Sequence, residues 1–181
     1  MSLKSIGVFC SAREDLPEAV QETAWELGRW IGQTNRELVY GGVRKGLMEI
    51  VAQSVKKNGG RVKGIIPQSM AWNGMGSNFV DVEMVVADLA DRKATMMREA
   101  DAFVALPGGI GTLDEVFSVW AAWQVGEHHK PLFLINIHGF WDGLSDFIAQ
   151  CVRQGYIRKE SYRSVMLPRS VKELARFLEE G

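Results

Sequence analysis

The chain has 181 residues, of which 46% are hydrophobic and 24% charged, and its formal net charge is −1. These values are typical of one soluble globular domain, and they give no electrostatic reason to expect binding to nucleic acid or to an acidic membrane surface. No apolar run reaches the roughly 18 residues of a membrane span, and the early run at 6–10 is too short for a signal peptide. Cys10 and Cys151 are too few for a disulfide framework, so we expect a cytoplasmic protein.

The first part of the chain alternates between apolar strands and helices. We expect a buried strand at 5–10 and then a helix that begins near Pro17, because proline suits the first helical turn. A short strand at 38–40 leads through glycines into a helix with apolar residues from 47 to 55, and a third strand spans 61–66. The first two strands are each followed by a helix, and the third ends at Pro67.

Residues 68–79 have neither the helical nor the strand period, so we expect a loop there. A loop of this length is often functional, and Trp72 and Met75 are candidates to cover a ligand. A short strand at 80–86 and a helix at 88–100 are expected to follow.

The alternation continues to the end of the chain. We expect strands at 102–106, 131–136 and 165–167, and helices after residue 110, at 140–154 and after Ser170. Ser170 is the expected N-cap of the last helix, because Glu173 stands three residues further on.

This pattern predicts the fold. Continuously apolar strands between helices indicate a parallel sheet covered on both faces, so we predict an α/β, Rossmann-like single domain over residues 1–181. Ligands of such sheets bind beyond the carboxyl ends of the strands. The sequence places Ser11, Gly41–Gly42 and Pro107–Gly109 at three of these ends.

The turn at 107–112, Pro-Gly-Gly-Ile-Gly-Thr, joins an apolar strand to a helix. Glycines allow the backbone to approach a ligand closely, and the free N–H groups at the start of a helix suit an anion. Glu115 lies on the same helix face as Gly111 and Thr112, about one turn deeper. A tight structural corner is the simpler explanation of the glycines, but the added Thr112 and Glu115 favour a phosphate site with a reactive carboxylate beside it.

The helix at 88–100 carries the second candidate group. Arg92, Thr95 and Glu99 share one face, and Arg98 lies beside Thr95. Such charged runs usually face solvent. Because this helix directly precedes the strand that ends in the glycine turn, an arginine from it can instead reach the same crevice and bind a ligand anion.

The sequence lacks the usual signs of a metal or dinucleotide site. His128, His129 and His138 have no matching spacing of cysteine or carboxylate residues, and no Gly-x-Gly-x-x-Gly follows the first strand. We therefore predict no metal and no dinucleotide cofactor.

The helix after residue 110 is apolar on almost every side. Such a helix must be buried on several sides. Deep burial in the core is one explanation, and we prefer the other, in which half of the helix contacts the core and half contacts a second copy of the chain. A homodimer is thus expected.

These residues resemble a known signature. Arg92-Lys93-x-x-Met96, followed by Pro107-Gly108-Gly109-x-Gly111-Thr112-x-x-Glu115, resembles the signature of the LOG (Lonely Guy) family, formerly described as lysine decarboxylase-like. The likeness extends from about residue 5 to about residue 157. Further similar segments are Val8–Ser11, Val39–Gly42, Gly46–Met48, Ile65–Pro67 and Ala100–Phe103.

The resemblance implies an enzyme that hydrolyses the N-glycosidic bond of a nucleoside 5′-monophosphate, such as a cytokinin riboside monophosphate or AMP, to the free base and ribose 5-phosphate. It also implies a dimer and no cofactor. Glu115 and Arg92 would be the catalytic residues. The expected substrate-binding residues are Ser11, Gly42, Lys93, Arg98, Gly108, Gly109, Gly111 and Thr112.

The chain departs from the family pattern at Ala90-Asp91, at Gly74 in the segment 68–79, and in two further loops. Ser11-Ala12-Arg13 stands where a Gly-Ser-Ser-like loop is usual, and Val43-Arg44-Lys45, with Glu49 after it, replaces small residues. These changes leave a second hypothesis open, in which the chain is a nucleotide or molybdenum-cofactor binding or carrier protein of the same fold without turnover. A nucleotide sensor that acts through its dimer is a third, weaker hypothesis.

Overall fold

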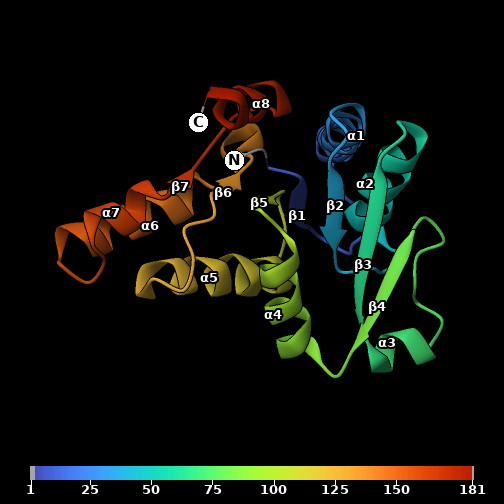
Figure 1. Cartoon of the computed structure of the whole chain (residues 1–181). Coiled ribbons are helices and arrows are strands. Elements are labelled where there is room, and N and C mark those ends of the chain that lie inside the picture. Colours follow the sequence, from blue (N-terminus) through green and yellow to red (C-terminus); the bar gives the residue numbers. More distant parts are fainter. Residues whose placement is uncertain (1–2, 181) are drawn as a thin grey trace.

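A sheet of seven parallel strands organises the computed structural model, which describes residues 3–180 (Figure 1). The strand order is β4-β3-β2-β1-β5-β6-β7, and every neighbouring pair is parallel. The strands are β1 (Ser5–Phe9), β2 (Glu37–Tyr40), β3 (Arg61–Pro67), β4 (Val82–Val86), β5 (Ala102–Ala105), β6 (Leu132–Leu134) and β7 (Val165–Met166).

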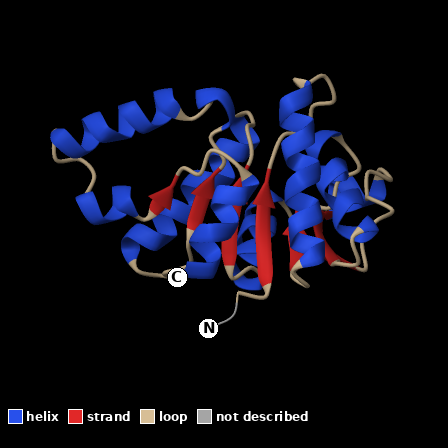
Figure 2. Cartoon of the chain, turned by 90° about the horizontal axis from the view of Figure 1, so that it is seen from above, coloured by secondary structure: helices blue, strands red, loops and turns tan. Residues whose placement is uncertain are grey.

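Helices cover both faces of the sheet, which confirms the predicted Rossmann-like α/β fold. Helices α1, α2 and α8 pack on one face, and α4, α5 and α6 pack on the other (Figures 1 and 2). The helices are α1 (Glu18–Gln33), α2 (Gly46–Lys57), α3 (Gln68–Trp72), α4 (Leu89–Glu99), α5 (Ile110–Val125), α6 (Asp142–Arg153), α7 (Lys159–Arg163) and α8 (Val171–Glu180), with a short 3₁₀ turn at Ile137–Gly139.

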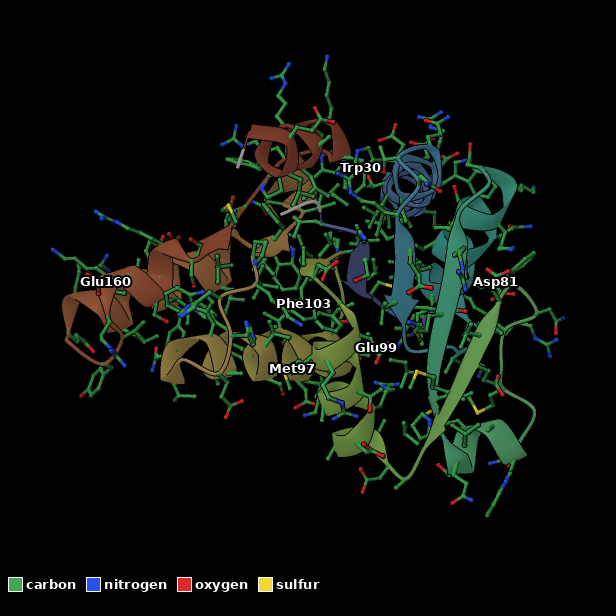
Figure 3. All side chains as sticks on the ribbon, in the orientation of Figure 1. Trp30, Asp81, Met97, Glu99, Phe103 and Glu160 are labelled. Carbon is green, nitrogen blue, oxygen red and sulfur yellow. The ribbon has the colours of Figure 1, made fainter. Side chains whose placement is uncertain are left out.

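Alternation along β1 divides the core into two layers. Ile6 and Val8 face the layer under α1 and α2, whereas Phe9 faces the layer under α4 and α5. There Phe9 stacks on Phe103 of β5, with ring centroids 5.7 Å apart, near the middle of the molecule (Figure 3). The strands are buried on both sides, as their continuously apolar sequence predicts.

The order in which consecutive strands are added to the sheet changes sides between β1 and β5. From β1 it builds outward through β2, β3 and β4, and it then returns to add β5, β6 and β7 on the other side. A crevice opens at such a switch point, beyond the carboxyl ends of the two central strands. The fold therefore brings the segments after β1, β2 and β5 together.

The prediction of a loop throughout 68–79 was wrong for its first part, because residues 68–72 form α3. Pro67 precedes this helix with an extended backbone, and a helix of five residues is too short to show a hydrophobic period. The helix α7 at 159–163 was also missed.

Other predicted details are confirmed or slightly shifted. The Ser170 hydroxyl accepts a bond of 3.2 Å from the Glu173 backbone N–H, as expected of the N-cap of α8. The helix expected at 140–154 begins at Asp142, after the 3₁₀ turn. No helix within residues 3–180 has the length and apolar character needed to span a membrane. Residues 1–2 and 181 of the predicted domain lie outside the described part.

Candidate active site

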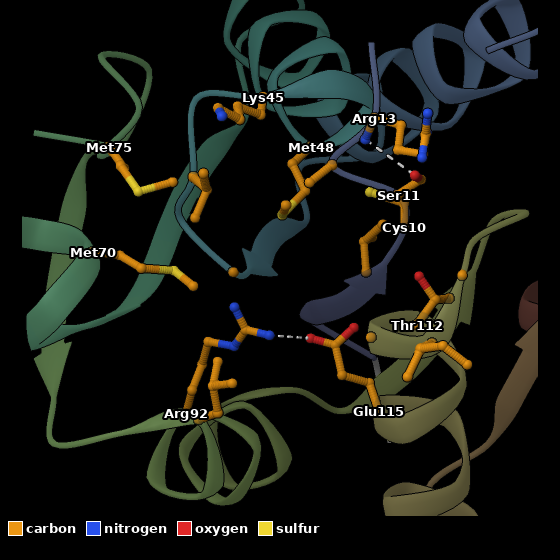
Figure 4. A pocket seen from close by; sticks show the side chains of 18 residues that line it. Cys10, Ser11, Arg13, Lys45, Met48, Met70, Met75, Arg92, Thr112 and Glu115 are labelled. Carbon is orange, nitrogen blue, oxygen red and sulfur yellow. Dashed lines mark hydrogen bonds and ion pairs between the residues drawn. The ribbon is translucent and has the colours of Figure 1, made fainter. Parts of the chain in front are cut away.

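A pocket of about 670 Å³ lies at the switch point, and it is lined by residues from the ends of β1, β2 and β5 and from α2, α4 and α5. Figure 4 shows two chemically different sides. Thr112 and Ser11 lie on one side, Met70 and Met75 lie on the opposite side, and Arg92 and Glu115 face each other below.

The ion pair between Arg92 of α4 and Glu115 of α5 is the central polar contact of the pocket. Arg92 Nη2 donates to Glu115 Oε1 over 2.9 Å, and the side chains are only 13% and 8% exposed. Within residues 3–180, neither the Nε of Arg92 nor the second carboxylate oxygen of Glu115 has a hydrogen-bond partner. The second carboxylate oxygen of Glu115 therefore keeps accepting capacity that a ligand can use, whereas the Nε of Arg92 is buried.

Local structure fixes the position of Arg92. Asp88 caps α4, and its carboxylate accepts bonds of 2.9 Å from the N–H groups of Ala90 and Asp91. At the end of β2, a Cβ on Gly41 would lie 3.2 Å from Arg92 Nη1, so the absence of a side chain leaves room for the guanidinium. A capped helix and a glycine thus aim Arg92 across the pocket at Glu115.

Burial changes the acidity of Glu115. Removal from water disfavours its charged form and raises its pKa from 4.5 to about 7, while the charge of Arg92 opposes this shift. Asp114 next to it adds a smaller upward effect, and Lys93 a smaller downward one. Glu115 can therefore exchange a proton near neutral pH, which is the range in which a carboxylate serves best as a general base.

The glycine turn forms the anion-binding side of the pocket. Gly109, Gly111 and Thr112 line it, at the N-terminus of the 16-residue helix α5. The N–H groups of this first turn have no partner within the helix and carry the positive end of its dipole. Gly108 lies just outside the lining, but a side chain there would collide with Thr112. The geometry suits a phosphate.

Ser11 reaches the pocket from the loop after β1, and two bonds hold this loop. The Ser11 hydroxyl accepts a bond of 3.1 Å from the Arg13 N–H, and its carbonyl accepts one of 3.0 Å from the Leu47 N–H. Cys10 also lines the pocket, and burial raises the pKa of its thiol, which keeps it neutral.

Three other predicted binding residues lie outside the pocket lining. Lys93 pairs with Asp114 over 2.7 Å, and Arg98 donates to the Thr95 hydroxyl over 2.6 Å. Gly42, with φ +70°, packs against the backbone of β3 at Gly64. Their roles in ligand binding remain predictions.

The methionine side of the pocket was only partly foreseen. Met48, Met70 and Met75 line it, whereas Trp72 does not and is 77% exposed. Met75 is held by its carbonyl, which accepts a bond of 2.8 Å from the Arg44 N–H. The only sequence signal for this side was the long aperiodic segment after β3.

Cations at the rim were not predicted as site residues either. Arg13 and Lys45 both line the pocket with exposed side chains. The sequence did carry a signal for them, since both stand in the two loops that depart from the family pattern. Among residues 3–180 there is no group of three or more histidine, cysteine or carboxylate side chains placed to hold a metal ion.

Comparison with known proteins identifies the family. The family model described as "Possible lysine decarboxylase" matches residues 48–178. The cytokinin riboside 5′-monophosphate phosphoribohydrolase LOG7 of Arabidopsis thaliana is 40% identical over 98% of this chain and 82% of that protein. The chain belongs to the LOG family. The matched range contains the whole signature, from Arg92 to Glu115.

Solved structures share the fold of this LOG family member. The X-ray structure named TM1055 is 27% identical, with a TM-score of 0.77, and covers 99% of this chain and 100% of that one. The molybdenum cofactor binding protein of Rippkaea orientalis has a TM-score of 0.76 at 24% identity and covers 99% of this chain and 98% of that one. At that identity the second likeness concerns the fold alone.

Proposed function

We propose that this LOG family enzyme hydrolyses the N-glycosidic bond of a nucleoside 5′-monophosphate and releases the free base and ribose 5-phosphate. The observation that carries the proposal is the buried pair of Arg92 and Glu115, which faces a pocket beside the glycine turn of α5. The name of LOG7, a phosphoribohydrolase 40% identical to this chain, supports the same reaction.

The glycine turn would bind the 5′-phosphate. The N–H groups from Gly109 to Thr112 and the hydroxyls of Thr112 and Ser11 would donate to its oxygens. A phosphate held there fixes the ribose toward the middle of the pocket, where Glu115 lies. Positioning of this kind accounts for part of the barrier reduction in a hydrolysis.

Glu115 would act on the ribose and on the attacking water. Its free oxygen would accept a bond from a ribose hydroxyl, and its negative charge would stabilise the oxocarbenium-like transition state. As the C1′–N bond breaks, the electron pair leaves with the base, water adds to C1′, and Glu115 takes the water proton, which then passes to the departing nitrogen and yields the neutral base. With a pKa of about 7, Glu115 can hold that proton and release it again.

Arg92 would position Glu115 and the ligand. A cation does not stabilise a developing oxocarbenium ion directly, so its roles are to orient the carboxylate and to donate to the ribose or the base. Lys93 and Arg98 would support the site indirectly, from the exposed pair with Asp114 and from the bond to Thr95.

The methionine side would receive the base. Thioether and aliphatic groups of Met48, Met70, Met75 and Leu89 offer an apolar, adaptable surface. This surface suits an adenine with an apolar substituent, so we propose a cytokinin riboside monophosphate or an AMP-like nucleotide as the substrate.

Product analysis tests this function. The protein would be incubated with isopentenyladenosine monophosphate, AMP, GMP, CMP and UMP, and the free base and ribose 5-phosphate would be quantified. We expect equal amounts of both products from at least one nucleotide, and a release about 10²–10³-fold slower with Glu115→Gln. No release from any nucleotide, together with a ligand-dependent rise in melting temperature, would favour the carrier hypothesis instead.

We also propose a cytoplasmic homodimer formed through α5. This helix leaves Ile110, Phe117 and Val125 exposed by 83%, 39% and 71%, although it carries a buried row on its other side. Exposed apolar side chains in such number are typical of an interface. Sedimentation should give twice the chain mass, and Phe117→Asp combined with Val125→Asp should shift the protein toward the monomer.

A further inference from the structure

The cations predicted from the signature are largely occupied by other groups. Arg92 is paired with Glu115, Lys93 with Asp114, and Arg98 with the Thr95 hydroxyl. A nucleoside monophosphate brings a charge of about −1.5 to −2 into the pocket at neutral pH. The N-terminus of α5 supplies part of the balancing positive charge, and a further cation at the pocket can supply the rest.

Arg13 is a cation of the pocket lining that lies beside the anion-binding side. In Figure 4 it lies beside Ser11, on the same side as Thr112. Its side chain is exposed, and within residues 3–180 it forms no ion pair, although Glu14 and Asp15 follow it in the chain. The guanidinium is thus free to turn toward an anion at the glycine turn.

The backbone that carries Arg13 is fixed in place. Its N–H donates to Ser11 Oγ, and the Ser11 carbonyl accepts from Leu47 in the first turn of α2. Gly46, with φ +52°, lies directly against the Ala12 and Arg13 backbone, where any side chain would collide. Because this backbone is already fixed, only the side chain of Arg13 loses conformational entropy when the guanidinium binds a ligand.

Lys45 lines the same pocket in a different place. Figure 4 shows it on the rim between Met75 and Arg13, further from Thr112. It also forms no ion pair within the described residues. Arg44, the residue before it, is exposed and does not line the pocket. Lys45, which lines the pocket, and Arg44, which does not, are therefore control positions for variants of Arg13.

We infer that Arg13 is a specificity-determining residue that binds the 5′-phosphate and makes the pocket prefer nucleotides over nucleosides. The inference rests on the proposed function, because it deepens the role of the same pocket. A planar guanidinium can donate two parallel bonds to a phosphate, which gives geometric selection as well as charge.

Steady-state kinetics with AMP or the best nucleotide tests the inference in the full-length protein. We expect Arg13→Ala to raise KM about tenfold to a hundredfold, the range for a hydrogen bond to a charged group, with kcat nearly unchanged. Arg13→Lys should recover part of the loss. Lys45→Ala should raise KM by less than about threefold, and Arg44→Ala should match the wild type, since neither contacts the phosphate.

A binding measurement separates this inference from the proposed function. In the Glu115→Gln background, where turnover is strongly reduced, calorimetry with AMP and with adenosine reports affinity. We expect Arg13→Ala to weaken AMP binding and to leave adenosine binding unchanged. An equal KM for Arg13→Ala and wild type, an equal loss in Lys45→Ala, or an equal weakening of AMP and adenosine would each overturn the inference. Absence of turnover in the wild type would overturn the hydrolase proposal alone.

Discussion

Two ion pairs link α4 to α5, and they use neighbouring positions on both helices. Arg92 and Glu115 are 2.9 Å apart with side chains 13% and 8% exposed, whereas Lys93 and Asp114 are 2.7 Å apart with side chains 21% and 54% exposed. One residue along a helix is a rotation of about 100°, which turns the first pair into the pocket and the second toward solvent. Similar contacts thus have different consequences, because burial decides whether a carboxylate becomes reactive.

Replacement of the two carboxylates should show the largest difference between the pairs, in their effect on kcat. We expect Glu115→Gln to lower kcat by about 10²–10³-fold, as when one preorganised group that stabilises the transition state is removed. The matched change Asp114→Asn should alter kcat by less than about threefold, because an exposed pair contributes little. Single-turnover base release would measure both. Comparable losses in the two variants would mean that burial does not distinguish the pairs.

Removal of the cations should affect stability in the same order. Arg92→Ala leaves the buried Glu115 without its partner, so we expect a loss of about 2–4 kcal/mol in the free energy of unfolding at pH 8. The loss should be smaller at pH 6, where Glu115 takes up a proton. Lys93→Ala should cost below about 1 kcal/mol. Urea denaturation at both pH values checks this, and equal losses for the two variants would contradict it.

The raised pKa of Glu115 makes stability depend on pH. The folded pKa of about 7 lies above the ordinary 4.5, so the protonated group stabilises the fold below pH 4.5, and this contribution is lost as the pH rises through 7. Relative to Glu115→Gln, the wild type should lose on the order of 3 kcal/mol between pH 4.5 and pH 8. If the free energies of unfolding of the wild type and of Glu115→Gln differ by a constant amount over this pH range, Glu115 keeps an ordinary pKa.

The exposed pair should still tune the buried one. If ionised Glu115 is required, kcat/KM should rise with pH through about 7. Asp114 raises the pKa of Glu115 and Lys93 lowers it, so Asp114→Asn should move this rise to lower pH and Lys93→Met to higher pH, each by less than about one unit. Shifts of the opposite sign would rule out this electrostatic link.

Much of the fold was predictable because its signals are local. Apolar strands followed by helices fix the parallel sheet, and the glycine turn with Glu115 lies within one strand–helix unit. The approach of Arg92 to Glu115, 23 residues apart, followed from the rule that strand ends meet at a switch point. Helical rotation placed Lys93 outside the pocket, and this was not apparent from the sequence motif alone.

The methionine side and Arg13 were not predictable in the same way. Met75 reaches the pocket through contacts between segments about 30 residues apart, since Arg44 bonds to Met75 and Ser77 donates to the Gly42 carbonyl over 2.9 Å. Arg13 reaches it because its loop packs on Gly46. Tertiary contacts of this kind leave no period in the sequence, and the irregular loops that make them were visible only as departures from a pattern.

The contact between the segments at 42–44 and 75–77 affects how a ligand exchanges. Val43 forms an antiparallel bridge with Gly76, and hydrogen bonds flank this bridge on both sides. The methionine side is thereby tied to the end of β2, the strand that also accommodates Arg92 beside Gly41. Because this contact holds the Met75 segment in place before a ligand arrives, that segment need not rearrange on binding, and we expect association to show a single kinetic phase.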